Sequence, residues 1–533
     1  MHHFLTIVFL FIGFALQAHI KADTLGQVTQ PNRYELKQKS ADNYFTIISL
    51  EEEGIALFRE LDKYKDGKRS YQLILLDNDL NERHDVTLEY DNKNVSMGYE
   101  YVSGTLFLLF RKGNSNKNEL ELSKINLSDA TSENFEIKPE IDMNITHFGV
   151  INNSVFFGGY VVNESSVFLY NFKEDQIKML PGFYQKDNDL IDLRSNQNNT
   201  FNVVLFDRGI KENPKIIFRT FDESGKQLLE DIIPVEPDIV IQTGLTSALE
   251  REDLALIGCW NYRGTKQASG FYFVSINPFA DQPIHYSYFG QLNQYFDYLK
   301  PKRAKKIKTK TALEIKEKKK VSHSNHIMPF RVFENTKGFS ILAEVYTPSS
   351  GTSYLSNPYD PYGMNPYSNG NYWPGYYYPG MGRMYSRYQN GQYINEDDEA
   401  MRLHETVLIF YDAQGNILKD YSVTLDDIKM PTLEQYSDFY SMDSKSSFLV
   451  YKKDEELVVT TFQSGVDAKQ EERYKVKLRS DFDEFRSERK KDGGVKIWFE
   501  NVFYTWGYQT IRNINEEDRV RDVFYINKVV IEQ

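Results

Sequence analysis

The chain has 533 residues, 41% of them apolar, so it is long enough to bury at least one large core. Its formal net charge is −13, and an acidic balance of this size argues against general binding to nucleic acid. The single cysteine, Cys259, excludes an internal disulfide, and its apolar context, LALIGCWNY, predicts a small core residue rather than a nucleophile. Aromatic residues make up 14% of the chain and favour strands over helices.

The first residues have the character of an export signal. Phe4 to Leu16 is a continuous apolar run of 13 residues, which is shorter than a membrane-spanning helix but typical of a signal-peptide core. We therefore predict a signal peptide over residues 1–22, with cleavage after Ala18 or Ala22; the alternative is a buried N-terminal strand. An exported protein of this size without disulfides fits a bacterial envelope best, so we expect the periplasm or cell surface of a Gram-negative bacterium. No cysteine follows the apolar run, so we expect no lipid anchor on an N-terminal cysteine.

Residues 23–533 contain a repeated strand pattern, which predicts a single β domain. Three hairpins have the same form, in which a turn rich in Asp, Asn or Gly joins two apolar strands; they begin at Tyr71, Ile216 and Val407. Further strand pairs precede such hairpins, and together they make four-stranded antiparallel units. About eight units can be placed, with starts near Tyr44, Met97, Ile145, Leu190, Thr243, Ile327, Tyr436 and Phe485.

Four-stranded units at this period predict an all-β fold, a β-propeller, because radial stacking of the blades buries both faces of each one. The pattern leaves the number open between seven and eight blades, since the last unit is irregular. The early segment NRYELKQKS, which begins at Asn32, is a candidate strand that pairs with the last blade and closes the ring.

One stretch supports a family resemblance. The residues from Gly338 to Tyr346 read GFSILAEVY, with Glu344 inside the pattern, and a later hairpin carries Asp412 and Gly415. This pattern resembles uncharacterised exported bacterial proteins of the β-propeller type. The resemblance extends over most of the mature chain, but the chain has neither a Trp-Asp pair at the end of each repeat nor the paired glycines of kelch repeats. It implies a propeller fold and an envelope location, and no activity.

The first of two insertions, at about residues 300–320, is strongly basic. It contains eleven Lys or Arg and two Glu, a local charge of +9. Its good helix formers predict a helix between blades, which is either a soluble connector or a contact for an acidic partner, such as anionic lipid headgroups or an acidic protein. Nucleic acid is a weaker alternative, because no aromatic residue is interleaved. The candidate electrostatic contacts are Lys302, Arg303, Lys305, Lys306, Lys318, Lys319 and Lys320.

The second insertion, at about residues 347–395, is rich in Tyr, Gly and Pro. Between Tyr346 and Tyr393 it holds 12 Tyr, 7 Gly and 6 Pro and almost no aliphatic residue, so it cannot build a core of its own. We predict a long loop within one blade, which is either a low-complexity loop or a contact for a protein or glycan partner. The candidate contacts are Tyr359, Tyr362, Tyr367, Tyr372, Trp373, Tyr376, Tyr377 and Tyr378.

The sequence contains no catalytic motif, and it predicts no catalytic residue, metal site or cofactor. The stretch from Asp77 to Asp85 imitates the start of a calcium loop, but it lacks a glycine at its sixth position and an acid at its twelfth, so a hairpin turn is the better interpretation. His323 and His326 have no third ligand nearby in the sequence and are a weak metal signal.

Two functions remain as hypotheses. The first is a non-enzymatic envelope protein, a rigid propeller that presents the Tyr-rich loop to a protein or glycan and the basic insertion to an acidic partner. The alternative is a polysaccharide-active enzyme, a hydrolase or lyase, that uses acidic residues in the central channel.

Overall fold

The structure is a computed structural model. It describes residues 27–39, 42–112, 119–162, 164–183, 188–208, 213–247, 254–265, 267–277, 279–321, 323, 326–335, 337–348, 388–389, 392–393, 401–430, 433–442, 446–463, 469–489 and 493–532. The predicted signal peptide, residues 1–22, lies outside the described residues. Among the described residues, no helix combines the length and the apolarity needed to cross a bilayer.

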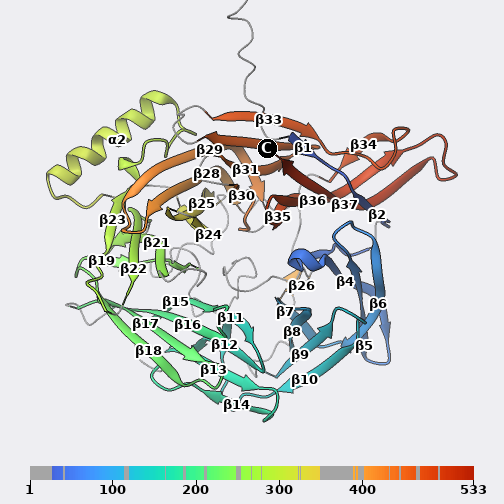
Figure 1. The fold of residues 1–533 in the computed structure, drawn as a ribbon, viewed down its shortest axis with the longest axis horizontal. Helices are drawn as coiled ribbons and strands as arrows, with labels where there is room; N and C mark the ends of the chain where they lie inside the picture. The colour runs from blue at the N-terminus through green and yellow to red at the C-terminus, as the bar shows by residue number, and fades with distance from the viewer. Residues whose placement is uncertain are drawn as a thin grey trace, which may run out of the picture.

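Eight antiparallel four-stranded blades are arranged in a ring (Figure 1). The predicted β-propeller is therefore confirmed, and the number of blades is eight. In blades 2, 3, 4, 6 and 7 the first strand lies nearest the centre of the ring and the fourth lies at its rim. The strands reflect the turn-bounded apolar runs of the sequence.

The first four blades have one strand for each expected segment. Blade 1 consists of β3 (Thr46–Ser49), β4 (Ile55–Lys65), β5 (Lys68–Leu76) and β6 (Glu82–Asp91), with the 3-10 helix η1 (Glu51–Glu53) between β3 and β4. Blade 2 consists of β7 (Asn94–Val102), β8 (Thr105–Lys112), β9 (Leu120–Asn126) and β10 (Ser132–Ile137). Blade 3 consists of β11 (Asn144–Ile151), β12 (Ser154–Val161), β13 (Glu164–Asn171) and β14 (Gln176–Met179). Blade 4 consists of β15 (Asn188–Ser195), β16 (Thr200–Asp207), β17 (Lys215–Asp222) and β18 (Gln227–Pro234).

The next three blades include both insertions. Blade 5 consists of a broken first strand, β19 (Ile239–Ile241) and β20 (Leu245–Thr246), with β21 (Leu254–Tyr262), β22 (Gly270–Ile276) and β23 (His285–Tyr288). Between blades 5 and 6 lie the 3-10 helix η2 (Phe289–Gln291) and the helix α2 (Pro301–Lys316). Blade 6 consists of β24 (His326–Asn335), β25 (Gly338–Pro348), β28 (Met401–Asp412) and β29 (Ile417–Met430), and a separate pair, β26 (Tyr388–Gln389) and β27 (Gln392–Tyr393), lies in the chain between β25 and β28. Blade 7 consists of β30 (Asp438–Ser441), β31 (Ser446–Lys453), β32 (Glu456–Gln463) and β33 (Gln470–Lys475).

Blade 8 joins the two ends of the chain. Its later strands are β34 (Glu484–Glu488), β35 (Gly494–Phe499), β36 (Val502–Arg512) and β37 (Val520–Glu532), and both β34 and β35 pair with β36. The outer strand comes from the other end of the chain, because β1 (Gln27–Thr29) and β2 (Arg33–Lys37) pair antiparallel with β37. This confirms the predicted closing strand.

The core is divided among the eight junctions between neighbouring blades. Each of eight apolar clusters contains side chains from two successive blades, and the cluster between blades 8 and 1 contains Tyr44, Trp498 and Phe524. Cys259 is fully buried in the cluster between blades 5 and 6, so its predicted role as a core residue is confirmed. Burial raises the pKa of the Cys259 thiol, which keeps it protonated.

The three similar hairpins of the sequence are turns between the third and fourth strands of blades 1, 4 and 6. In each, an aspartate accepts hydrogen bonds from the backbone N–H groups two and four residues later: Asp77, Asp222 and Asp412. The residue three positions after each aspartate has a positive φ, which Gly225 and Gly415 adopt without a side-chain clash. The carboxylate of Asp77 therefore serves its own hairpin turn, as predicted.

Candidate interaction surface at the two insertions

Both insertions leave the same face of the ring. The helix α2 lies in the connection from blade 5 to blade 6, and residues 349–400 lie in the connection from the second to the third strand of blade 6. Because successive strands alternate in direction, connections of these two kinds lie at the same end of the blades. Pro348 and Met401 are register partners, so the Tyr-rich insertion starts and ends at one point on this face.

Residues 293–298 lead into α2, and we call them the lead segment. They contact the root of the Tyr-rich insertion. The ring of Tyr298 stacks on that of His404, with centroids 5.3 Å apart and planes inclined by 19°. His404 Nε2 is hydrogen-bonded to Thr347 Oγ1 at 3.0 Å, and the backbone N–H of Phe296 donates to Glu405 Oε1 at 3.2 Å. The residues that flank the two insertions therefore meet in space, which the sequence pattern did not predict.

Two buried carboxylates of blade 6 hold this lead segment in place. The backbone N–H groups of Asn293 and Gln294 donate to the two carboxylate oxygens of Asp420, at 2.9 and 2.7 Å. Glu405 accepts from Phe296 and also from the hydroxyl of Ser422. Burial raises the pKa of Glu405 to about 7, although these hydrogen bonds lower it. These hydrogen bonds fix the residues that precede α2 in position against blade 6.

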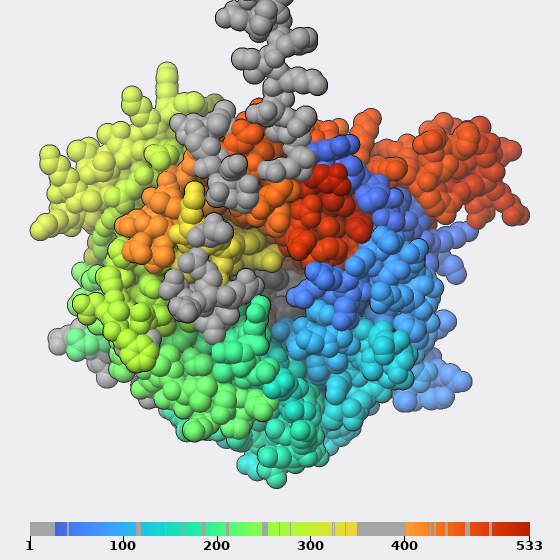
Figure 2. Space-filling view, viewed as in Figure 1, coloured from blue at the N-terminus to red at the C-terminus, as the bar shows by residue number. Residues whose placement is uncertain are grey.

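The helix α2 has one packed face and one solvent-exposed face. Ala304 and Ile307 pack against the cluster between blades 5 and 6, and Thr311 is buried against Gly290. The prediction of a helix between blades is confirmed. Figures 1 and 2 show that α2 stands at the rim, outside blades 5 and 6. The outward side carries the six exposed basic residues that we call the cationic face: Lys302, Arg303, Lys305, Lys306, Lys310 and Lys316.

The predicted electrostatic residues divide into two groups. Lys302, Arg303, Lys305 and Lys306 are exposed, and none of them forms an ion pair with any residue that the structure describes. Toward the other end, Lys319 pairs with Glu317 at 2.7 Å, and Lys320 lies 3.5 Å from Asp238 and 5.8 Å from the centroid of the Tyr262 ring. Lys318 is exposed and has a φ of 53°, just beyond the helix. The first group is thus the one available to a partner.

The position of the first group is unfavourable for the helix itself. The N-terminus of a helix carries a partial positive charge, so acidic residues stabilise its first turn and basic residues do not. The first turn of α2 contains no acidic residue, and its N-cap residue, Lys300, makes no capping hydrogen bond through its side chain. The packed face compensates, since most helical stability in proteins comes from tertiary contacts. Helix stability therefore does not explain why these residues are basic.

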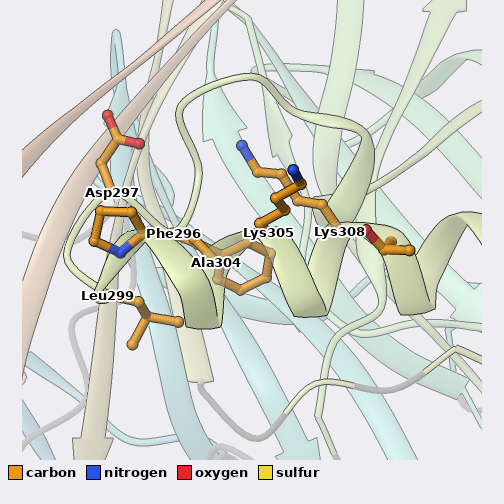
Figure 3. Close-up of a pocket in the computed structure, with 8 residues that line it drawn as sticks. Phe296, Asp297, Leu299, Ala304, Lys305 and Lys308 are labelled. Carbon is orange, nitrogen blue, oxygen red and sulfur yellow. The ribbon is translucent and has the colours of Figure 1, made fainter.

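A pocket of about 360 Å³ lies beside the first turns of α2 (Figure 3). Its apolar lining comes from Phe296, Leu299, Pro301 and Ala304, and its polar lining comes from Asp297, Lys305, Lys308 and Thr309. Lys308 Nζ donates to the backbone oxygen of Asn293. Burial raises the pKa of Asp297, although Lys469 and Lys308 lower it. The pocket thus combines an apolar wall with ammonium groups from the helix.

The eight predicted aromatic contacts lie outside the described residues: Tyr359, Tyr362, Tyr367, Tyr372, Trp373, Tyr376, Tyr377 and Tyr378. Of their insertion, the structure describes the root at Pro348 and Met401 and the short pair β26 and β27. The prediction that this insertion lies within one blade is confirmed, because β25 and β28 are neighbours in the sheet. The proposed contacts of the tyrosines stay a prediction.

A second group of titratable residues lies on the inner strands of blades 2 to 4. It consists of Glu100 on β7, His147 on β11, and Asp192 and Arg194 on β15. Burial raises the pKa of Glu100 to about 8, although Arg194 lowers it, and burial lowers the pKa of His147 to about 4. Asp192 accepts hydrogen bonds from the backbone N–H and the hydroxyl of Thr246, at 2.8 and 2.7 Å, and so links blades 4 and 5.

Sequence reasoning missed this inner group because its members come from three blades and form no local motif. Among the described residues, no cluster of three or more His, Cys, Asp or Glu side chains is placed to hold a metal ion. His323 stacks near Phe289 and Phe296, with centroids 5.6 and 5.4 Å away, and burial lowers its pKa to about 4. This residue packs as an aromatic side chain in its surroundings.

Known proteins similar to this chain were found among solved structures alone. No protein-family model and no curated protein matches the chain. Similar solved structures include the polysaccharide lyase Uly1 (8% identity, 93% of this chain and 100% of that one, TM-score 0.38) and the β-propeller domain of the Trilobed protease from Pyrococcus furiosus (10%, 80% and 95%, 0.34). A prolyl endopeptidase matches with 8% identity over 85% of this chain and 53% of its own length, with a TM-score of 0.35. Identities of 8–10% and TM-scores of 0.34–0.38 carry no argument about this chain.

Proposed function

We propose that the protein is a non-enzymatic scaffold that binds an acidic partner through the cationic face of α2. The observation that carries the proposal is a group of four exposed basic residues at the N-terminal end of the helix that form no ion pair within the described part of the chain: Lys302, Arg303, Lys305 and Lys306. An acidic partner would neutralise both these charges and the partial charge of the helix terminus. The fastened lead segment keeps the face oriented, so little ordering entropy opposes binding.

The proposal includes the Tyr-rich insertion and an envelope location. The insertion leaves the ring beside the lead segment of α2, where Tyr298 stacks on His404 and His404 is hydrogen-bonded to Thr347. Its composition suits contact with a protein or a glycan, because Tyr and Trp give large contacts at low entropy cost. The apolar run before residue 22 supports export to the periplasm or cell surface.

The test is a capture experiment with purified residues 23–533 and a bacterial envelope fraction. The variant Lys302→Gln/Arg303→Gln/Lys305→Gln/Lys306→Gln removes four charges from the cationic face. We expect it to lose at least about tenfold in captured material at low salt, because surface charge attraction is strongest there. Deletion of residues 350–398 is expected to lower capture further if the insertion makes its own contact.

The control has the same change in charge at another place. Lys63, Lys65, Lys93 and Lys173 are exposed and form no ion pair with any described residue, and their replacement by Gln leaves α2 intact. Equal capture by the two four-charge variants would contradict the proposal, since it would show that binding depends on net charge and not on the helix.

A second candidate function is acid–base chemistry at the centre of the ring, on a polysaccharide substrate. The observation that favours it is the position of Glu100, a half-buried carboxyl on the inner strand β7 of blade 2, where desolvation raises its pKa to about 8 and so favours a protonated acid at neutral pH. The test is product release from a polysaccharide panel by the wild type and by Glu100→Gln. Activity that Glu100→Gln abolishes while binding persists would establish this role and contradict the non-enzymatic one.

A further inference from the structure

The cationic face has the shape of a straight, convex strip. From Lys302 to Lys316 it spans about 21 Å, at about 1.5 Å per helical residue. The opposite side of the helix is occupied by the blades, so the strip can meet a partner only from outside the rim (Figure 2). A convex strip makes contact along its whole length with a flat surface, whereas it offers no groove in which a polymer chain could lie.

The residue types favour a surface of diffuse negative charge. Of the eleven basic residues in 300–320, ten are lysines and one is Arg303. Lysine is a compact point charge that lacks the planar fork with which arginine recognises a carboxylate or phosphate in a defined geometry. The exposed side chains of α2 include no aromatic residue, which excludes stacking on bases. Leu313, 54% exposed, is the one large apolar side chain that the helix leaves in solvent.

The distribution of charge predicts a single orientation. The chain has a net charge of −13, and residues 300–320 carry +9, so the rest of the chain carries −22. A negatively charged surface repels that remainder and attracts the strip, so only the face that bears α2 can approach it. The pocket beside the helix adds an apolar wall next to Lys305 and Lys308, a combination that suits an amphiphile with an anionic head.

We propose that the acidic partner of α2 is the surface of an anionic phospholipid bilayer. This inference rests on the proposed function and names the chemistry of its partner. The protein binds peripherally, with the ammonium groups of the cationic face among the lipid phosphates and Leu313 at the headgroup level. Each lysine near such a surface contributes roughly a fivefold gain in partitioning. Removal of four charges is therefore expected to lower vesicle binding by about two orders of magnitude or more.

The experiment is sedimentation of purified residues 23–533 with vesicles of phosphatidylcholine alone or with about 30% phosphatidylglycerol, at about 0.05 M and about 0.5 M salt. We expect binding only to the anionic vesicles at low salt. The variant Lys302→Gln/Lys306→Gln/Lys310→Gln/Lys316→Gln should lose it, and the control at Lys63, Lys65, Lys93 and Lys173 should retain it. Far-ultraviolet circular dichroism and thermal unfolding establish that both variants are folded.

The outcomes separate this inference from the function on which it rests. Vesicle binding that requires the cationic face supports both. Absence of vesicle binding, together with capture of an acidic protein that still depends on the cationic face, overturns the lipid inference and leaves the proposed function standing. If the four-charge variants of the cationic face retain both vesicle binding and capture, the lipid inference and the proposed function are both overturned. Equal binding to phosphatidylcholine vesicles overturns the electrostatic mechanism.

Discussion

Buried carboxylates fasten neighbouring blades of this ring to each other. Glu344 of blade 6 accepts hydrogen bonds from the backbone N–H groups of Tyr436 and Ser437, and from the Ser437 hydroxyl at 2.8 Å, in the segment that enters blade 7. Asp438 of blade 7 accepts from the N–H of Ile497 in blade 8 at 2.9 Å. Burial of a carboxylate without partners would lower the stability of the fold. These hydrogen bonds compensate for the lost hydration of Glu344 and Asp438.

The buried glutamates predict a specific pH dependence of stability. Burial, with a smaller contribution from the nearby Asp438 and Asp297, respectively, raises the pKa of Glu344 and of Glu405 from 4.5 to about 7. Their contribution to stability is therefore fully present below pH 4.5 and is lost as the pH rises to 7. Glutamine cannot ionise. We expect the stability of Glu344→Gln/Glu405→Gln relative to wild type to increase from about pH 5 to 8, by on the order of 3 kcal/mol per site.

Urea unfolding at a series of pH values measures this difference. The exposed Glu52 on η1 provides the control, because Glu52→Gln removes a carboxylate that is not buried. A difference between double variant and wild type that stays constant with pH would show that the two carboxyls are not shifted. The free energy of unfolding of the wild type must be subtracted from that of the variant. Burial lowers the pKa of His147 and of His323, so these two residues make stability increase with pH between 4 and 6.5, opposite to the glutamates.

Residue-scale predictions from the sequence were reliable where partners are close in the chain. The turn of Asp412 was predictable, because its donors lie two and four residues away. Glu344 stood inside the recognised GFSILAEVY pattern, but its role was not predictable, since Ser437 lies 93 residues away. The role of Glu100 was not predictable for the same reason, because Arg194, which affects its pKa, lies two blades away.

At the scale of the element, the seating of α2 depends on a close contact with η2. A Cβ atom on Gly290 would lie 2.5 Å from the hydroxyl oxygen of the buried Thr311. We expect Gly290→Ala to push the helix from its place, at a cost of about 1–3 kcal/mol. The ring should stay folded, because the other seven junction clusters include no residue of α2. Limited trypsin digestion measures the effect, since a loosened α2 exposes the lysine-rich backbone of residues 300–320 to cleavage.

Thr309→Ala is the matched control, because Thr309 is exposed on the same helix and should leave the rate of cleavage unchanged. Equal cleavage of wild type and Gly290→Ala would show that the contact with Thr311 can relax. Gly290→Ala is also expected to weaken partner capture, because a displaced helix no longer presents its charges in a fixed direction.

The insertions show what the sequence predicts about elements and what it does not. The composition of residues 300–320 predicted a helix, and the strands on either side of the Tyr-rich tract predicted a loop inside one blade; both are confirmed. Their convergence was not predictable. It depends on the common direction of two chain connections and on contacts such as Tyr298 with His404, which no sequence period encodes.

At the scale of the whole molecule, the fold followed from repetition. All eight predicted unit starts lie within a few residues of the first strand of a blade, from β3 at Thr46 to β34 at Glu484. The number of blades stayed open because blade 8 divides its inner strand into β34 and β35, with an irregular register against β36. The eighth junction cluster decides the matter, since the rings of Phe524 and Phe45 lie 4.8 Å apart and the indole N–H of Trp498 donates to the backbone oxygen of Gly54.

Ring closure gives the last prediction. The strands β1 and β2 supply the outer strand of blade 8, and the N–H of Lys528 donates to Asn32 at 3.0 Å. Tyr34 and Leu36 also pack on the cluster between blades 8 and 1. Burial of two such side chains and the lost strand pairing are together worth about 5 kcal/mol. For a chain of this length that corresponds to a fall of about 5 °C in Tm, which we expect when residues 23–38 are deleted.

Hydrogen exchange distinguishes local opening of the ring closure, the junction of blades 8 and 1 that we call the seam, from general destabilisation. Without β1 and β2, the amides of β37 that faced them should lose protection, while those of blades 3 and 4, on the far side of the ring, should keep theirs. A synthetic peptide of residues 24–38 should restore the protection by adding the missing strand to the free edge, and a peptide of scrambled order should not. Uniform loss of protection around the ring would instead mean that the propeller unfolds as one unit and that its seam is no weaker than its other junctions. Retained protection of β37 would show that the seam is held by the contacts of Trp498 and Phe524 alone, without the N-terminal strand.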